Sequence, residues 1–264
     1  AAVVSFIVFV WAERHAAEPL MPPALFGIRT IALASCGVFV LGMSMFGMFV
    51  YLPLYLQGVL GMTAAASGML FVPMIFAMIF ASMTSGQIVS RTGRYKFLAV
   101  AGAVLATTGM GLLARLGAEA SANTILWCLV VAGFGFGAAQ PVYALVVQNA
   151  APRAQLGAAT ATSQFFRSIG STIGVAVFGT LLLGMYHDGL AAGLPADTPA
   201  DLRLVGDNPL QMNGEHGLIV HGPPRPEIPP AVQAIVRASL AAGMQRVFVL
   251  TSLVMALSIV LNLL

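Results

Sequence analysis

Long uncharged runs alternate with short polar segments along most of this chain. A helix that crosses the hydrocarbon core of a bilayer needs roughly 20 mostly apolar residues. Six runs approach or exceed that length with few or no charges: residues 31–56, 64–89, 97–114, 124–147, 158–185 and 244–264. The pattern predicts an all-α membrane protein with six complete transmembrane helices.

The chain begins with an apolar segment, residues 1–11, that is too short to cross a bilayer. We interpret it as the end of a preceding transmembrane helix. A proline-rich segment follows it, and proline cannot extend a helix interior. Residues 1–30 are therefore predicted to form the end of one helix and a cytoplasmic linker, and residues 31–264 a six-helix unit.

One long polar stretch interrupts the six-helix unit. It holds eight of the 15 prolines, between His187 and Arg237, which predicts an external loop with little regular structure at about residues 186–240. At the end of this stretch, apolar residues recur at helical spacing from Val232 to Leu240. That spacing predicts an amphipathic lead-in to the last helix.

Composition supports a membrane protein. Hydrophobic residues make up 59% of the 264 positions and charged residues 8%, with a mean hydropathy of +0.92, whereas soluble domains carry about 25% charged residues. The net charge of +3 does not indicate nucleic-acid binding, because the basic residues lie in loops beside the apolar runs. Their excess in short loops on one side predicts a cytoplasmic C-terminus.

A short basic loop, residues 86–96, joins the second and third predicted helices. Gly93 would allow a tight turn in it. Arg91 and Arg94 could hold one conformation by pairing with helix carbonyl ends or acids, or could simply anchor the cytoplasmic side of the membrane.

This loop resembles a signature of the major facilitator superfamily, found between the second and third helices of each half. The signature is a glycine, an Asp-Arg pair and then Gly-Arg-Lys, and four positions match it: Gly86, Arg91, Gly93 and Arg94. Ser90 stands where the first copy carries its acid, and Tyr95 where it carries a basic residue. These departures are typical of the degenerate copy in the C-terminal half.

Two more segments resemble the fourteen-helix drug:proton antiporters of this superfamily. Residues 18–26, Glu-Pro-Leu-Met-Pro-Pro-Ala-Leu-Phe, are similar to the linker before their C-terminal six helices, and residues 164–170 add to the likeness. The resemblance implies proton-coupled export of hydrophobic or cationic small molecules, such as drugs, across the cytoplasmic (inner) membrane by alternating access. The implied partners are the small-molecule substrate, protons, membrane lipid and a missing N-terminal half.

Polar side chains inside the predicted helices indicate where a substrate cavity would lie, since such groups usually face other helices or a water-filled space. The expected cavity residues are Tyr51, Tyr55, Gln57, Gln140, Tyr143 and Arg167. Arg167 could instead be an interfacial anchor. By the resemblance, Gly86, Arg91, Gly93 and Arg94 act as a conformational gate.

Glycines and a repeated tripeptide make further predictions. Residues 170–174 form a GxxxG pattern and residues 133–137 place three glycines in five positions, which predicts close helix approach in lipid. Pro-x-Tyr occurs at residues 53–55 and 141–143. Inverted three-helix repeats would place these two tyrosines near opposite faces of the membrane.

The residue types that are missing limit the chemistry. No complete predicted helix contains an acid, so a proton-carrying carboxylate is expected in the missing part of the protein. Cys36 and Cys128 lie inside predicted helices, and no catalytic or nucleotide-binding motif is present, so we expect no enzyme, metal site or cofactor. An exporter of one specific metabolite and a non-transporting membrane scaffold remain alternatives.

Overall fold

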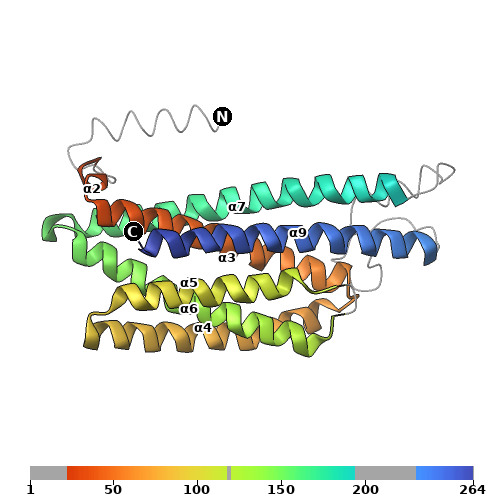
Figure 1. Ribbon diagram of the computed structural model, residues 1–264, viewed down its shortest axis with the longest axis horizontal. Helices are drawn as coiled ribbons and strands as arrows, with labels where there is room; N and C mark the ends of the chain where they lie inside the picture. Colours follow the sequence, from red (N-terminus) through yellow and green to blue (C-terminus); the bar gives the residue numbers. More distant parts are fainter. Residues whose placement is uncertain (1–22, 118–119, 194–229, 264) are drawn as a thin grey trace.

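The computed structural model describes residues 23–117, 120–193 and 230–263, which form an elongated bundle of helices (Figure 1). The helices are α2 (Pro23–Phe26), α3 (Arg29–Gly58), α4 (Ala64–Thr92), α5 (Tyr95–Ala114), α6 (Ala122–Ala150), α7 (Leu156–Gly193) and α9 (Pro230–Leu263), with a 3-10 turn, η1 (Arg153–Gln155), before α7. Six of them are long and apolar enough to cross a membrane. The described residues contain no strand, so the all-α prediction is confirmed.

The helices extend beyond the predicted spans, most of all around the expected external loop. α7 continues to Gly193 and α9 begins at Pro230, so both ends of the range 186–240 are helical. The predicted lead-in to the last helix is thus a continuous part of α9. Residues 194–229 lie outside the described residues, as do residues 1–22, where the end of a preceding helix was predicted.

Local side chains explain where several helices begin and end. The Thr63 hydroxyl accepts a hydrogen bond from the backbone N–H of Ala66, and Ser121 does the same for Thr124, so α4 and α6 have capped N-termini. α4 ends at Gly93, which has φ of 66° and donates its N–H to the carbonyl of Val89. This left-handed conformation confirms the tight turn predicted at Gly93.

The helix contacts relate the first three long helices to the last three. α4 packs along α6 as α7 packs along α3, and α5 packs on α6 as α9 packs on α3. If α3, α4 and α5 are exchanged with α6, α7 and α9 in that order, the pair α4–α6 becomes the pair α7–α3, and the pair α5–α6 becomes the pair α9–α3. Two sets of three helices, set one (α3, α4, α5) and set two (α6, α7, α9), build the bundle, as expected for inverted repeats.

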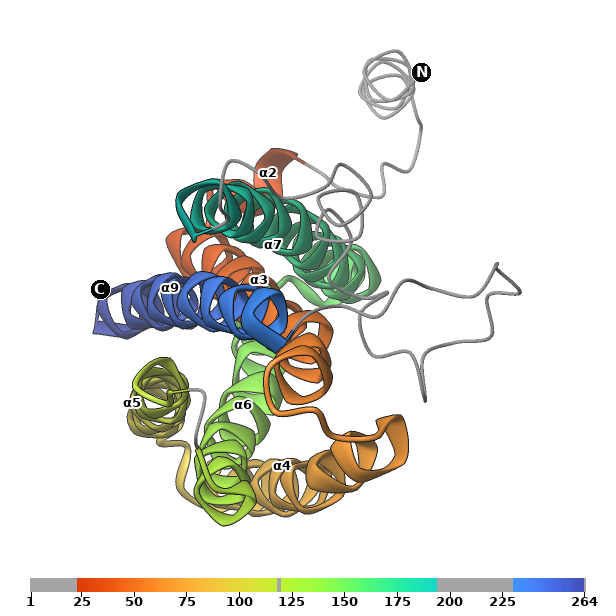
Figure 2. The same ribbon diagram turned by 90° about the vertical axis from the view of Figure 1, so that its right-hand side faces the viewer.

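In the view along the bundle, α4 and α7 lie at opposite extremes, α3 and α6 lie between them, and α5 and α9 share one side (Figure 2). One contact breaks the equivalence of the two sets. α7 and α9 pack along each other, whereas α4 and α5 hardly touch. α7 and α9 meet at the last turns of α7 and the first turns of α9, where Gly189 approaches Ser239 and Gly193 approaches Ile235, and again where Gly243 approaches Leu182.

Glycines let α6 lie close to two neighbours at once. A Cβ at Gly133 would be 2.6 Å from the carbonyl oxygen of Met74 on α4, and Gly137 meets α4 one turn later. A Cβ at Gly135 would instead collide with the backbone of Ala106 on α5. The predicted close approach at residues 133–137 is therefore confirmed.

The glycines of α7 serve its contact with α3. A Cβ at Gly174 would lie 2.7 Å from the carbonyl oxygen of Met43, and Gly170 meets the carbonyl of Phe39. From the first contact to the second, the position moves four residues forward on α7 and four residues forward on α3. The two helices therefore run side by side in the same direction. Close backbone approach of this kind maximises van der Waals contact where lipid offers no hydrophobic driving force.

Candidate substrate site

A polar cavity of about 80 Å³ lies between α3, α6 and α7. α6 and α7 touch over only a short stretch, and the cavity lies in the gap that this leaves. We call this cavity the polar wedge, after the polar side chains that line it: Gln140, Thr160, Ser163, Gln164 and Arg167. The structure therefore brings together two of the predicted cavity residues, Gln140 and Arg167.

Arg167 reaches the polar wedge from well inside α7. It lies about 16 Å along the helix from Leu156, at 1.5 Å per residue. Its side-chain stem rests on α3, where a Cβ at Gly42 would be 3.2 Å from Arg167 Cγ. Its guanidinium makes no hydrogen bond or ion pair with any described residue. Asp188, near the far end of α7, is the only acid in the described part of the chain.

The other predicted cavity residues on α3 lie against neighbouring helices and loops. Tyr51 donates its hydroxyl to the carbonyl of Val175 on α7. Tyr55 donates to the carbonyl of Gly117 at 2.8 Å, and its ring meets Phe248 edge-on. Gln57 donates to the Ser67 hydroxyl at 3.1 Å.

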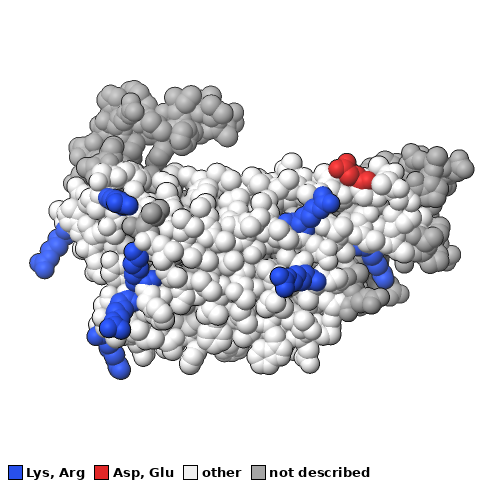
Figure 3. Space-filling view, in the orientation of Figure 1, with Lys and Arg blue, Asp and Glu red and all other residues white. Residues whose placement is uncertain are grey.

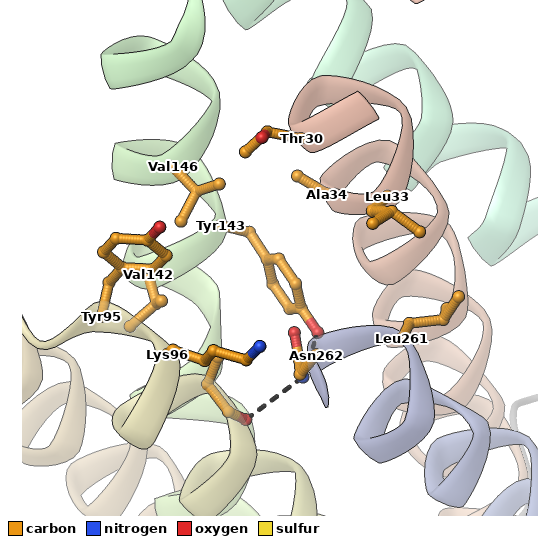
Figure 4. A pocket seen from close by; sticks show the side chains of 11 residues that line it. Thr30, Leu33, Ala34, Tyr95, Lys96, Val142, Tyr143, Val146, Leu261 and Asn262 are labelled. Atoms are coloured by element: carbon orange, nitrogen blue, oxygen red, sulfur yellow. Dashed lines mark hydrogen bonds between the residues drawn. The ribbon is translucent and has the colours of Figure 1, made fainter. Parts of the chain in front are cut away.

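Tyr143 lies in a different place, at the end of the bundle that carries the basic loop. It is 3% exposed, its hydroxyl is 2.7 Å from the Ser258 hydroxyl, and the amide of Asn262 donates to it at 2.9 Å. Figure 4 shows Tyr143 and Asn262 meeting at one side of a second cavity, of about 150 Å³, with Lys96 nearby. Tyr143 thus joins α6 to α9, which share little other contact.

The two Pro-x-Tyr tyrosines hold equivalent positions in the two sets. Tyr55, on the first helix of set one, binds just beyond the end of α5, the third helix of that set. Tyr143, on the first helix of set two, binds in the last turns of α9, the third helix of that set. The tyrosines lie at opposite ends of the bundle, as the inverted repeat predicts.

The basic loop between α4 and α5 is largely exposed. Arg91 and Arg94 are both exposed and make no ion pair with the described residues. The contact with a helix carbonyl end comes instead from Lys96, whose Nζ donates to the carbonyl of Leu263 at 2.8 Å. A Cβ at Gly86 would meet nothing within 4 Å.

Charged side chains on the face of the bundle seen in Figure 3 gather towards both ends of the bundle, with an uncharged band between them.

Three polar wedge residues were not singled out from the sequence as site residues. Thr160, Ser163 and Gln164 precede Arg167 at spacings that place all four on one face of α7. That period of polar residues within an apolar run is the signal that would have found them. Ser258 and Asn262, four residues apart on α9, carry the same kind of signal for the partners of Tyr143.

Six apolar helices in two equivalent sets of three define a multi-pass membrane protein with the architecture of secondary transporters. Residues 1–175 match the Major Facilitator Superfamily. The chain belongs to this superfamily, whose members are transporters rather than enzymes.

Curated relatives include transporters and a resistance determinant. The chain is 37% identical over 193 residues to an uncharacterised MFS-type transporter of Mycobacterium tuberculosis, covering 73% of this chain and 28% of the relative. It is 32% identical over 181 residues to the multidrug transporter protein MdtP of Bacillus subtilis, covering 69% and 33%. It is 35% identical over 208 residues to a tetracycline resistance determinant of Streptomyces rimosus, covering 76% and 57%.

A solved structure agrees with the fold. A bacterial homologue of the human lysosomal transporter Spinster, in an inward-facing and unoccupied conformation, aligns with 90% of this chain and 48% of its own, with a TM-score of 0.64 and 15% identity. The chain spans between about a quarter and three fifths of the relatives described above.

Proposed function

We propose that the protein containing this chain exports hydrophobic or cationic small molecules across the cytoplasmic membrane by alternating access, driven by proton entry. The polar wedge is the observation on which the proposal rests. It places Gln140 and Arg167 together in a gap between apolar helices, and polar groups at such depth usually serve a ligand pathway. The names of the Bacillus and Streptomyces relatives support drugs as the class of substrate.

The chain would supply half of the transporter. In this proposal the polar wedge and the adjoining surfaces of α3 and α7 contact the substrate, with Tyr51, Tyr55, Gln57 and Tyr143 close to the pathway or setting the helix positions around it. An N-terminal half would complete the cavity. Because no described helix carries an acid at membrane depth, the proton-carrying carboxylate would come from that half.

In the same proposal the conformational gate is formed by four residues of the basic loop: Gly86, Arg91, Gly93 and Arg94. The turn at Gly93 holds both arginines exposed at the end of α4. There they are available to bind acids of the other half or lipid phosphates in one conformation only. We place this end of the bundle, with the C-terminus, in the cytoplasm, because short loops rich in Lys and Arg favour that side.

Transport by the full-length protein in liposomes tests the proposal. With an imposed pH gradient, we expect accumulation of ethidium or tetracycline, and we expect a protonophore to abolish it. A folded protein that moves neither compound under any gradient would contradict export. Movement that continues unchanged after the gradient is collapsed would contradict proton coupling alone.

A further inference from the structure

We propose that the polar wedge binds an anionic oxygen group of the exported molecule, such as a carboxylate, phenolate or enolate. This inference rests on the proposed function and narrows its substrate class. The preferred substrates would be apolar molecules that carry an acidic group, including zwitterions. A molecule with only a cationic group, such as ethidium, would have no partner in this cavity and would have to be bound by other parts of the transport pathway.

Three side chains of the polar wedge have unused hydrogen-bonding capacity. Gln140, Gln164 and Arg167 make no hydrogen bond with any described residue. Three other long polar side chains, at contacts between different elements of the bundle, do have partners. Gln57 donates to Ser67, Gln245 donates to the carbonyl of Leu116, and Asn262 donates to Tyr143: the donor to acceptor distances are 3.1, 2.8 and 2.9 Å.

The unused groups are mainly donors aimed at one space. A guanidinium offers only donors, and each glutamine amide adds two more. A carboxylate accepts two parallel hydrogen bonds from a guanidinium, an arrangement that is stronger than neutral pairs. The hydroxyl of Ser163 lines the same cavity and can donate as well, whereas the hydroxyl of Thr160 donates to the carbonyl of Leu156 at 2.9 Å. The donor set therefore fits an acceptor with negative charge.

Charge balance points the same way. A cation at membrane depth is costly without a partner, and no acid lies near Arg167 in the described helices. An anionic ligand would neutralise it. The stem of Arg167 lies against α3 at Gly42, so the base of this side chain lies beside the cavity.

The size of the cavity indicates that it takes one chemical group rather than a whole molecule. Its volume is about 80 Å³, whereas sites for drug-sized ligands enclose about 300–1,000 Å³. The apolar body of the substrate would remain outside the wedge, against α3 and α7 and the other half of the transporter. Recognition of the acidic group can then be tested separately from recognition of the body.

Two probes that differ only in this group provide the test: 2-naphthoxyacetate and its uncharged amide, 2-naphthoxyacetamide. Uptake of each is measured in liposomes that contain the full-length protein or a variant. Arg167→Gln should lower carboxylate uptake about tenfold, the effect of losing one charge-assisted pair, and leave amide uptake within about twofold. Arg167→Lys should give an intermediate value for the carboxylate. Comparing variants for one probe cancels its partitioning into lipid.

A matched control removes the same charge elsewhere. Arg153→Gln changes η1 at the same end of α7 but does not line the wedge, and it should leave both probes unaffected. Gln164→Leu gives a second wedge variant if Arg167→Gln does not fold, as judged by size-exclusion chromatography. It should lower carboxylate uptake more than amide uptake.

Three results would overturn the inference. The first is an equal fall for both probes, which would indicate a structural role for Arg167, and the second is no change for either. The third is a wild-type protein that moves ethidium but neither naphthoxy probe, which would leave export intact and reject the anionic subsite. A wild-type protein that moves none of the three would reject the proposed function itself.

Discussion

The hydroxyls of Tyr143 and Ser258 lie 2.7 Å apart and connect α6 to α9. Asn262 donates to the same tyrosine oxygen at 2.9 Å. The three side chains form the polar contact between two helices that otherwise share little surface. Tyr143 and Ser258 are both buried, so removal of either hydroxyl leaves the other with Asn262 as its remaining side-chain partner and costs free energy.

A double-mutant cycle measures this contact. Tyr143→Phe and Ser258→Ala should each lower the free energy of unfolding in micelles. Their combined loss should be smaller than the sum by about 0.6 kcal/mol and at most about 1.7 kcal/mol, the range of hydrogen bonds between membrane helices. Thr180→Ala is the control, since Thr180 binds only the carbonyl of Ala176 in its own helix. Strictly additive losses would show that the two hydroxyls do not interact.

The approach of Gly137 to the backbone of α4 predicts a steric penalty. A Cβ at this position would overlap the carbonyl oxygen of Met78. Gly137→Ala should therefore lower the free energy of unfolding by about 1–3 kcal/mol, the usual cost of overpacking. Gly68→Ala on α4 should have no such cost, since a Cβ there meets nothing within 4 Å. Equal thermal stability of the two variants would contradict the close packing of α4 and α6.

The turn at Gly93 predicts a penalty of a different kind. Its φ of 66° is the left-handed region that side chains with a Cβ disfavour, although a Cβ would meet no neighbour. Gly93→Ala should cost about 1 kcal/mol of stability. Gly86→Ala, in the helical and uncrowded last part of α4, should be neutral or slightly stabilising because alanine favours helix. Thermal unfolding of the two variants checks the difference.

The gate proposal predicts that two arginines matter more for transport than for insertion. Replacing Arg91 and Arg94 together by glutamine should lower the transport rate at least about tenfold, while the amount of protein in the membrane changes little. Replacing Arg29 and Arg153 by glutamine removes the same charge from the same end of the bundle and should leave transport close to normal.

Membrane fractionation and uptake assays, run side by side, separate the two roles. A proportional loss of insertion and transport in the Arg91 and Arg94 variant would favour simple anchoring. A similar transport defect in the Arg29 and Arg153 variant would show that total basic charge, and not the loop, is responsible.

The positions of the six membrane-spanning helices could be predicted from local sequence, for a simple physical reason. A helix in lipid satisfies its own backbone hydrogen bonds, so a sufficiently long apolar run is enough to define it. The same local logic holds for the turn at Gly93 and for the glycines at residues 133–137. The local argument is weaker at the end of α7 and the start of α9, where the helices continue beyond the apolar runs that a bilayer requires.

The sequence by itself determined the class of protein, the order of its helices and the list of polar residues within them. Only the tertiary structure decided how each helix is rotated, because helices that are apolar on all sides carry little periodic signal. That rotation buries Tyr55 and Tyr143 in contacts between elements and gathers Gln140 and Arg167 in one cavity. Those placements depend on backbone approaches between distant segments, such as Gly42 against Arg167, which no local pattern specifies.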